Sequence, residues 1–106
     1  MKVLFICNMG KHRSKTAAEL FASEFSTEYA GLYSENPVSN KQIEDADLIV
    51  VMEEEQRHEI ASRFPSLYLR KRIINLNITD VYAYNDPHLI DLLKIAFSEK
   101  IRPLLE

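Results

Sequence analysis

Two short segments of the chain are almost continuously apolar and rich in valine and isoleucine, residues 2–7 and 47–52. Runs of this kind are typical of parallel strands that are buried on both faces of a sheet. Two further strands are predicted at residues 29–34, which lie just before an Asn-Pro pair, and at residues 72–78. The apolar pattern therefore predicts four strands.

The segments between the strands have the period of amphipathic helices. One apolar stripe runs from Ala17 to Phe25, residues 53–64 carry a few apolar positions on a polar background, and the last stripe runs from Ile90 to Leu104. Strands that alternate with helices predict a three-layer α/β fold, in which helices cover both faces of a parallel sheet. Ligands in such sheets bind at the carboxyl ends of the strands.

The first predicted strand ends in the only cysteine, Cys7, and Arg13 and Ser14 follow where a helical pattern begins. Backbone N–H groups of such a loop can turn inward, and the helix N-terminus adds a positive field, which favours the thiolate form of a cysteine. Arg13 offers a planar fork that matches two phosphate oxygens, and Gly10 permits the positive φ of a tight loop. The segment therefore predicts an anion site with a nucleophile at its floor, which is the chemistry of a cysteine-dependent phosphatase.

The predicted phosphate-binding residues form one continuous loop: Asn8, Met9, Gly10, Lys11, His12, Arg13 and Ser14. Lys11 and His12 are expected at the rim, where they raise the positive potential. Ser14 has two interpretations, donation to the thiolate and capping of the helix N-terminus. The alternative to the whole site is that a lone cysteine at a strand end is simply a small buried hydrophobic residue.

Composition and charge bear on the number of domains, the classes of partner and the cellular location. With 106 residues and 46% hydrophobic content, we expect one domain over residues 1–106. The net charge of −3 gives no support to nucleic-acid binding, and neither a signal peptide nor a membrane span is expected. A single cysteine excludes an internal disulfide and fits a reducing cytosol, so a cytoplasmic location is expected. His58 and His88 lack the spacing of metal ligands, and no metal is expected.

Residues 3–21, VLFICNMGKHRSKTAAELF, resemble the opening of the low-molecular-weight protein tyrosine phosphatases, and the chain looks closest to a short bacterial branch of that family. The family signature is V-L-F-V-C, a five-residue loop, then Arg-Ser and a helix. Residues 46–54 and 78–82 resemble its third strand, which ends in a methionine and an acidic residue, and its I-x-D-P-Y segment. The resemblance implies a four-stranded parallel sheet of strand order 2-1-3-4 and a site without a cofactor. It also implies a phosphorylated protein or small phosphoester as substrate.

The family's loop reads Leu-Gly-Asn-Ile-Cys, whereas residues 8–12 of this chain read Asn-Met-Gly-Lys-His, and two of these differences bear on function. Gly10 stands where the family has an asparagine that braces the loop, and His12 stands where it has a second cysteine. An oxidised Cys7 would therefore have no internal thiol with which to form a disulfide.

A phosphatase of this kind also needs a carboxylic acid that protonates the leaving oxygen, and Asp80 and Asp86 are the candidates. Asp80 matches the acid of the I-x-D-P-Y segment, although Val81 replaces its proline. Asp86 directly precedes Pro87, which is a common pairing at the start of a helix. We favour Asp80 as the general acid and keep Asp86 as the alternative.

The predicted function is hydrolysis of a phosphomonoester, with phosphotyrosine implied by the resemblance, through a phosphocysteine on Cys7. Tyr82, which matches the family's tyrosine, and Tyr84 either wall an aromatic substrate pocket or pack structurally. One alternative is a phosphoryl carrier of the sugar phosphotransferase IIB type, whose C-x-x-G-x-x-x-S loop also fits Cys7, Gly10 and Ser14. Another is a phosphate- or phosphopeptide-binding module with weak catalysis.

Overall fold

The computed structural model describes residues 1–105 and contains one four-stranded sheet. The strands are β1 (Lys2–Cys7), β2 (Ser26–Gly31), β3 (Leu48–Val51) and β4 (Ile73–Asn75). All neighbouring strands are parallel, and their order is β2-β1-β3-β4. The predicted α/β fold and strand order are therefore confirmed.

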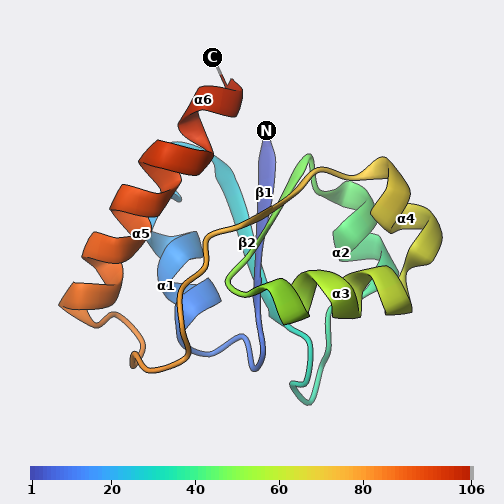
Figure 1. Cartoon of the computed structure of the whole chain (residues 1–106), viewed down its shortest axis with the longest axis horizontal. Helices are drawn as coiled ribbons and strands as arrows, with labels where there is room; N and C mark the ends of the chain where they lie inside the picture. The colour runs from blue at the N-terminus through green and yellow to red at the C-terminus, as the bar shows by residue number, and fades with distance from the viewer. Residues whose placement is uncertain (106) are drawn as a thin grey trace.

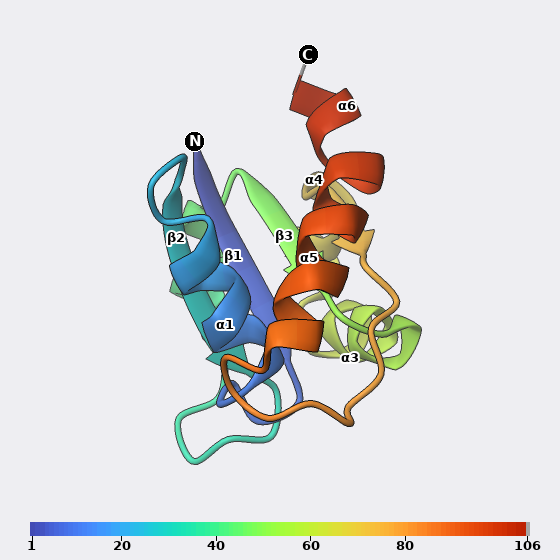
Figure 2. The same ribbon diagram turned by 90° about the vertical axis from the view of Figure 1, so that its left-hand side faces the viewer.

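Helices cover both faces of this sheet. They are α1 (Arg13–Leu20), α2 (Asn40–Asp45), α3 (Glu54–Arg63), α4 (Pro65–Arg70), α5 (Pro87–Lys100) and α6 (Arg102–Leu105). Helices α1 and α5 lie on one face, and α2, α3 and α4 lie on the other (Figures 1 and 2). Within residues 1–105, no helix combines the length and the apolar character needed to cross a bilayer.

The central strand β1 supplies side chains to two separate cores. Val3 and Phe5 join the core beneath α1 and α5, whereas Leu4 and Ile6 join the core beneath α2, α3 and α4. All four side chains are at most 1% exposed. Because burial of one such side chain contributes about 1.5–3 kcal/mol, β1 is a firmly anchored element from which to present a site.

The second strand begins three residues earlier than residues 29–34 and ends at Gly31. It lies at the edge of the sheet, so its first residues are half-exposed and polar, and an apolar run does not mark them. Beyond Gly31 the chain leaves the strand but stays close, because the Leu32 N–H donates to the Cys7 carbonyl at 3.0 Å.

Two other boundaries differ from the sequence pattern. The strand expected over residues 72–78 is shortened to β4, because Asn77 adopts a φ of 59° that interrupts extended backbone. The helix predicted over residues 53–64 ends at Arg63, and Pro65 begins α4, which the apolar pattern did not predict. Proline at the first helical position is favoured because its missing N–H has no partner there in any case.

Candidate active site

The candidate site lies at the carboxyl end of β1, where residues 8–12 connect the strand to α1. Cys7 is the last residue of β1 and is only 3% exposed. Its Sγ lies 3.1 Å from the Ser14 hydroxyl oxygen and accepts from the Gly10 N–H at 3.2 Å. The sulfur is therefore held in contact with two polar groups beside the loop, a position that suits a nucleophile.

Ser14 does not cap the helix, which was the other interpretation of this residue. The N-cap position of α1 is His12, and Ser14 lies inside the first turn, fully buried. Its hydroxyl faces the Cys7 sulfur at 3.1 Å and the Ala30 carbonyl at 3.5 Å. Of the two interpretations, the contact with the sulfur is the one observed.

The loop is curled tightly against β2, and Gly10 is the residue that permits this. Its φ is +68°, and a Cβ at this position would lie 2.7 Å from the Gly31 nitrogen and 2.9 Å from the Ala30 carbonyl carbon. The loop is also tied to the chain after β2, because the Tyr33 N–H donates to the Asn8 carbonyl at 2.8 Å. Only glycine combines this backbone conformation with so close an approach.

Arg13, the first residue of α1, is 1% exposed. Its Nη1 donates to Glu53 Oε1 at 2.6 Å and to the Ile78 carbonyl at 2.7 Å. Within residues 1–105, its Nε and Nη2 are buried and have no hydrogen-bond partner. Buried donors are normally satisfied, so a guanidinium with one anchored and two open nitrogens is suited to an oxyanion with several acceptor oxygens.

The two candidate acids lie in different environments. Asp80 Oδ1 is 3.6 Å from the Arg13 Nε, and its side chain is half-exposed. Asp86 is the N-cap of α5 and accepts from the His88 N–H at 2.8 Å. The structure therefore brings Asp80, and not Asp86, together with the guanidinium beside the Cys7 loop.

Two residues of this site were not among the sequence candidates. Glu53, directly after the buried run of β3, is the anion that pairs with Arg13. Gln56 is buried on α3 and donates from Nε2 to Asn8 Oδ1 at 3.1 Å, while its Oε1 accepts from the Met52 N–H at 2.7 Å. The signal for Glu53 was present in the sequence, since the resembling strand ends in a methionine and an acidic residue.

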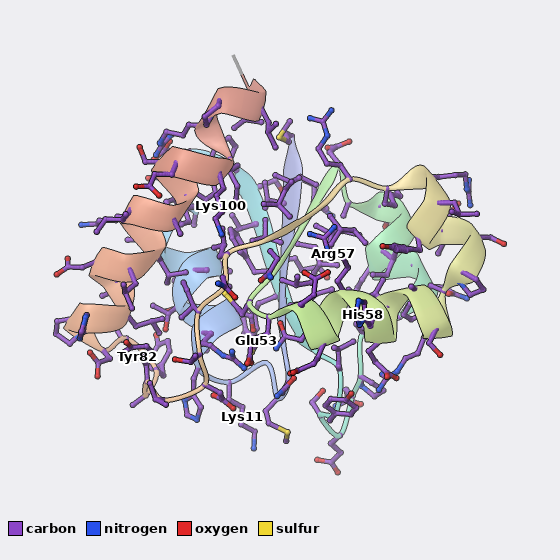
Figure 3. The ribbon with its side chains drawn as sticks, viewed as in Figure 1. Lys11, Glu53, Arg57, His58, Tyr82 and Lys100 are labelled. Atoms are coloured by element: carbon purple, nitrogen blue, oxygen red, sulfur yellow. The ribbon has the colours of Figure 1, made fainter. Side chains whose placement is uncertain are left out.

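The rim of the loop is open to solvent. Met9, Lys11 and His12 are exposed, and the Lys11 side chain extends away from the sheet, below Glu53 in Figure 3. A hollow of about 470 Å³ adjoins the loop, lined by residues 9–11, 29–31 and 34–36. Within residues 1–105, no group of three or more His, Cys, Asp and Glu side chains is placed to hold a metal ion.

The two tyrosines have different positions. Tyr82 packs toward α5, where its ring lies edge-on to His88 with 5.4 Å between centroids, and it lines a second hollow of about 290 Å³ along that helix (Figure 3). It is not among the residues that line the hollow beside the loop. Tyr84 instead contacts the residue that ends the loop, His12.

Three solved structures share this arrangement of strands and helices. A mutant of the arginine phosphatase YwlE with a phosphorylated active-site serine is 20% identical over 98% of this chain and 99% of its own, with a TM-score of 0.71. The tyrosine phosphatase Wzb from Escherichia coli K30, in complex with phosphate, is 17% identical over 92% and 94%, with a TM-score of 0.75. A low-molecular-weight protein tyrosine phosphatase from Bacillus subtilis is 18% identical over 93% and 98%, with a TM-score of 0.71.

The sequence comparisons are less informative than the structural ones. No protein-family model matches the chain, and no curated protein matches it. At identities of 17–20%, the structural likeness establishes the architecture alone. The chain has the fold of the low-molecular-weight protein tyrosine phosphatases.

Proposed function

We propose that this protein is a cysteine-dependent phosphatase that hydrolyses a phosphomonoester through a phosphocysteine intermediate. The observation that carries the proposal is the pairing of Cys7 with Arg13. A buried sulfur that accepts from the Gly10 N–H and a buried guanidinium with two open nitrogens lie at the two ends of the same short loop. An inert thiol needs neither feature, whereas transfer of a phosphoryl group to sulfur needs both.

In the first step, the Cys7 sulfur attacks phosphorus in line with the leaving oxygen. The S–P bond forms as the P–O bond breaks, and Asp80 transfers its proton to the departing oxygen. Arg13 and the loop N–H groups hold the equatorial oxygens, whose charge spreads in the transition state. Glu53 fixes the position of the Arg13 guanidinium, because its Oε1 accepts a hydrogen bond from Arg13 Nη1 at 2.6 Å.

In the second step, Asp80 accepts a proton from a water molecule that attacks phosphorus. The S–P bond breaks, inorganic phosphate leaves and the thiolate is restored. The 3.6 Å distance between Asp80 and Arg13 supports Asp80 in this role, because a ligand on the guanidinium lies within reach of that carboxyl group. Asp86 is already engaged as a helix cap, which argues against it.

We propose a phosphorylated tyrosine as the group that is hydrolysed. Several structural neighbours are named as tyrosine phosphatases, and two are named as arginine phosphatases. The residues that line the hollow beside the loop include Tyr29 and Lys11, which suit an aromatic ring that bears an anionic group, and also Glu35.

The test is hydrolysis of para-nitrophenyl phosphate by the wild type and by Cys7→Ser, with a chelator present. We expect turnover by the wild type that resists the chelator and disappears in the variant. His58→Ala is a matched control, because His58 is exposed on α3. Equal turnover by the wild type and Cys7→Ser would refute the proposal, and phosphate binding without turnover would indicate a carrier or a binding module instead. Phosphotyrosine and phosphoarginine, offered separately, then test the substrate class.

A further inference from the structure

One face of α1 and the residue that caps it contact a pair of residues far along the chain, Tyr84 and Asn85. The contacting residues have the spacing i, i+3, i+4, i+7, which places them on one side of the helix: His12, Lys15, Thr16 and Glu19. The pair belongs to the irregular segment of residues 79–86, which carries Asp80. Helix α1 therefore holds the segment that bears the candidate acid.

The contacts made by this face are specific hydrogen bonds to backbone. The Tyr84 N–H donates to His12 Nδ1 at 3.1 Å, and the Asn85 N–H donates to Thr16 Oγ1 at 2.8 Å. Asn85 has a φ of 61°, a conformation that needs local support in a residue other than glycine. The Tyr84 side chain adds a hydrogen bond to Glu19 and stacks beneath the Lys15 ammonium, 4.5 Å from the ring centroid.

His12 is the member of this group that belongs to the phosphate loop itself. Its backbone carbonyl accepts from the Thr16 N–H at 3.0 Å and from Thr16 Oγ1 at 2.7 Å, which fixes the start of α1. A ring nitrogen that accepts a hydrogen bond carries no proton, so His12 acts here through its unprotonated Nδ1. This differs from the role expected from the sequence, in which His12 contributed only to the positive potential of the rim.

Asp80 has little other restraint. Its side chain is half-exposed and its contact with protein is the 3.6 Å approach to Arg13. On one side, the chain is fixed at Ile78, whose N–H donates to the Met52 carbonyl at 2.8 Å and whose carbonyl binds Arg13. On the other side, the Tyr82 ring packs against His88 of α5, and the next backbone group that α1 holds by a hydrogen bond is the Tyr84 N–H. The contact between Tyr84 and His12 is therefore one of the restraints that set the position of Asp80 over the loop.

We propose that His12 is a positioning residue whose unprotonated Nδ1 holds the Tyr84 N–H and thereby keeps Asp80 over the phosphate loop. The inference rests on the proposed function, in which Asp80 is the general acid. Loss of the contact lets residues 79–86 move. The larger part of the defect therefore falls on protonation of the leaving group rather than on phosphate binding.

The test compares three variants with the wild type. His12→Ala removes the acceptor, His12→Asn restores an acceptor oxygen near the place of Nδ1, and His58→Ala is the control for loss of an exposed histidine. The rate is measured with phenyl phosphate, whose leaving group needs the acid, and with para-nitrophenyl phosphate, whose leaving group needs it less. Inhibition by inorganic phosphate reports the state of the loop, and hydrogen exchange of residues 79–86 reports the contact directly.

For His12→Ala, we expect turnover of phenyl phosphate to fall about tenfold, a part of the 10²–10⁴-fold that general acids contribute. Turnover of para-nitrophenyl phosphate falls by a clearly smaller factor, so the ratio of the two rates changes, and inhibition by inorganic phosphate measures separately any loss of binding at the loop. The Tyr84 amide exchanges faster in His12→Ala than in the wild type. His12→Asn restores most of the turnover of phenyl phosphate and most of the protection of the Tyr84 amide from exchange. His58→Ala changes neither the turnover nor the exchange.

Failure of this inference is distinct from failure of the proposed function. An active, Cys7-dependent wild type combined with an unchanged substrate ratio in His12→Ala would overturn the positioning role. Equal losses in His12→Ala and His12→Asn would also overturn it, because the acceptor would then be irrelevant. If the wild type has no turnover, the proposed function fails, and the positioning role of His12 in catalysis fails with it.

Discussion

Gly10→Ala is the change that tests the shape of the phosphate loop most sharply. A new Cβ would lie 2.7 Å from the Gly31 nitrogen, so the backbone has to move by roughly 0.7 Å to reach ordinary contact near 3.4 Å. The left-handed φ of +68° costs alanine about 1–2 kcal/mol, and the overlap with β2 costs about 1–3 kcal/mol more. We therefore expect the free energy of unfolding to fall by about 2–5 kcal/mol.

The same movement displaces the Gly10 N–H, which lies 3.2 Å from the Cys7 sulfur. Because misplacement of reacting groups by about 1 Å can cost about 10²-fold in rate, we expect kcat/KM for para-nitrophenyl phosphate to fall by about that factor. Urea denaturation measures the first effect and steady-state kinetics the second. Ser98→Ala, at an exposed position of α5, is the control and should change stability by less than about 0.5 kcal/mol. A Gly10→Ala variant with the stability and activity of the wild type would refute this account of the loop.

Three further predictions concern acidic groups around the site. Asp80→Asn should lower turnover of phenyl phosphate by about 10²-fold. Asp86→Asn keeps a good helix cap and should change this turnover by less than about twofold. If Asp86→Asn has the larger effect, Asp86 and not Asp80 is the general acid. Glu53→Gln should lower the free energy of unfolding, measured in urea, by about 1–2 kcal/mol. Loss of one partner of a fully buried ion pair costs about 3–5 kcal/mol, and the effect is smaller here because the Glu53 side chain is 27% exposed. An unchanged midpoint of the urea transition would contradict the role of Glu53 as an anchor for Arg13. The hydrogen bond to Glu19 raises the pKa of Tyr84 in the folded protein. The protonated phenol therefore stabilises the folded state at pH values below its ordinary pKa, and this stabilisation is lost as the pH rises through the raised pKa of the folded state. Glu19→Gln should lower the pKa of Tyr84 in an ultraviolet titration, and no change would show that the contact is absent in solution.

The sequence predicted the parts of this molecule that depend on neighbouring residues. The apolar run that ends in Cys7 is a buried central strand, Gly10 has the positive φ expected of it, and α1 begins at Arg13. Each of these features follows from local chemistry, namely burial, backbone freedom and helix periodicity. The start of β2 was missed because an edge strand needs no apolar run, and the residues at that start, from Ser26 on, are polar.

The contacts that complete the site were beyond the reach of sequence patterns. Glu53 meets Arg13 across 40 residues of chain, and Tyr84 meets His12 across 72. A hydrophobic period specifies which face of an element is buried but not which polar groups meet at its end. Asp80 was favoured over Asp86 through a resemblance to a known segment and because Asp86 precedes Pro87 as a helix cap often does. The structure contains that cap, in which Asp86 accepts from the His88 N–H.

The central claim is that the Cys7 sulfur carries the phosphoryl group during turnover. The most direct measurement is rapid mixing with para-nitrophenyl phosphate, followed by a denaturing quench and mass spectrometry of the peptide that contains Cys7. The account predicts a phosphoryl group on Cys7 that appears in the first turnover and disappears when the substrate is exhausted. Turnover at an undiminished rate with no phosphoryl group on that peptide would contradict it.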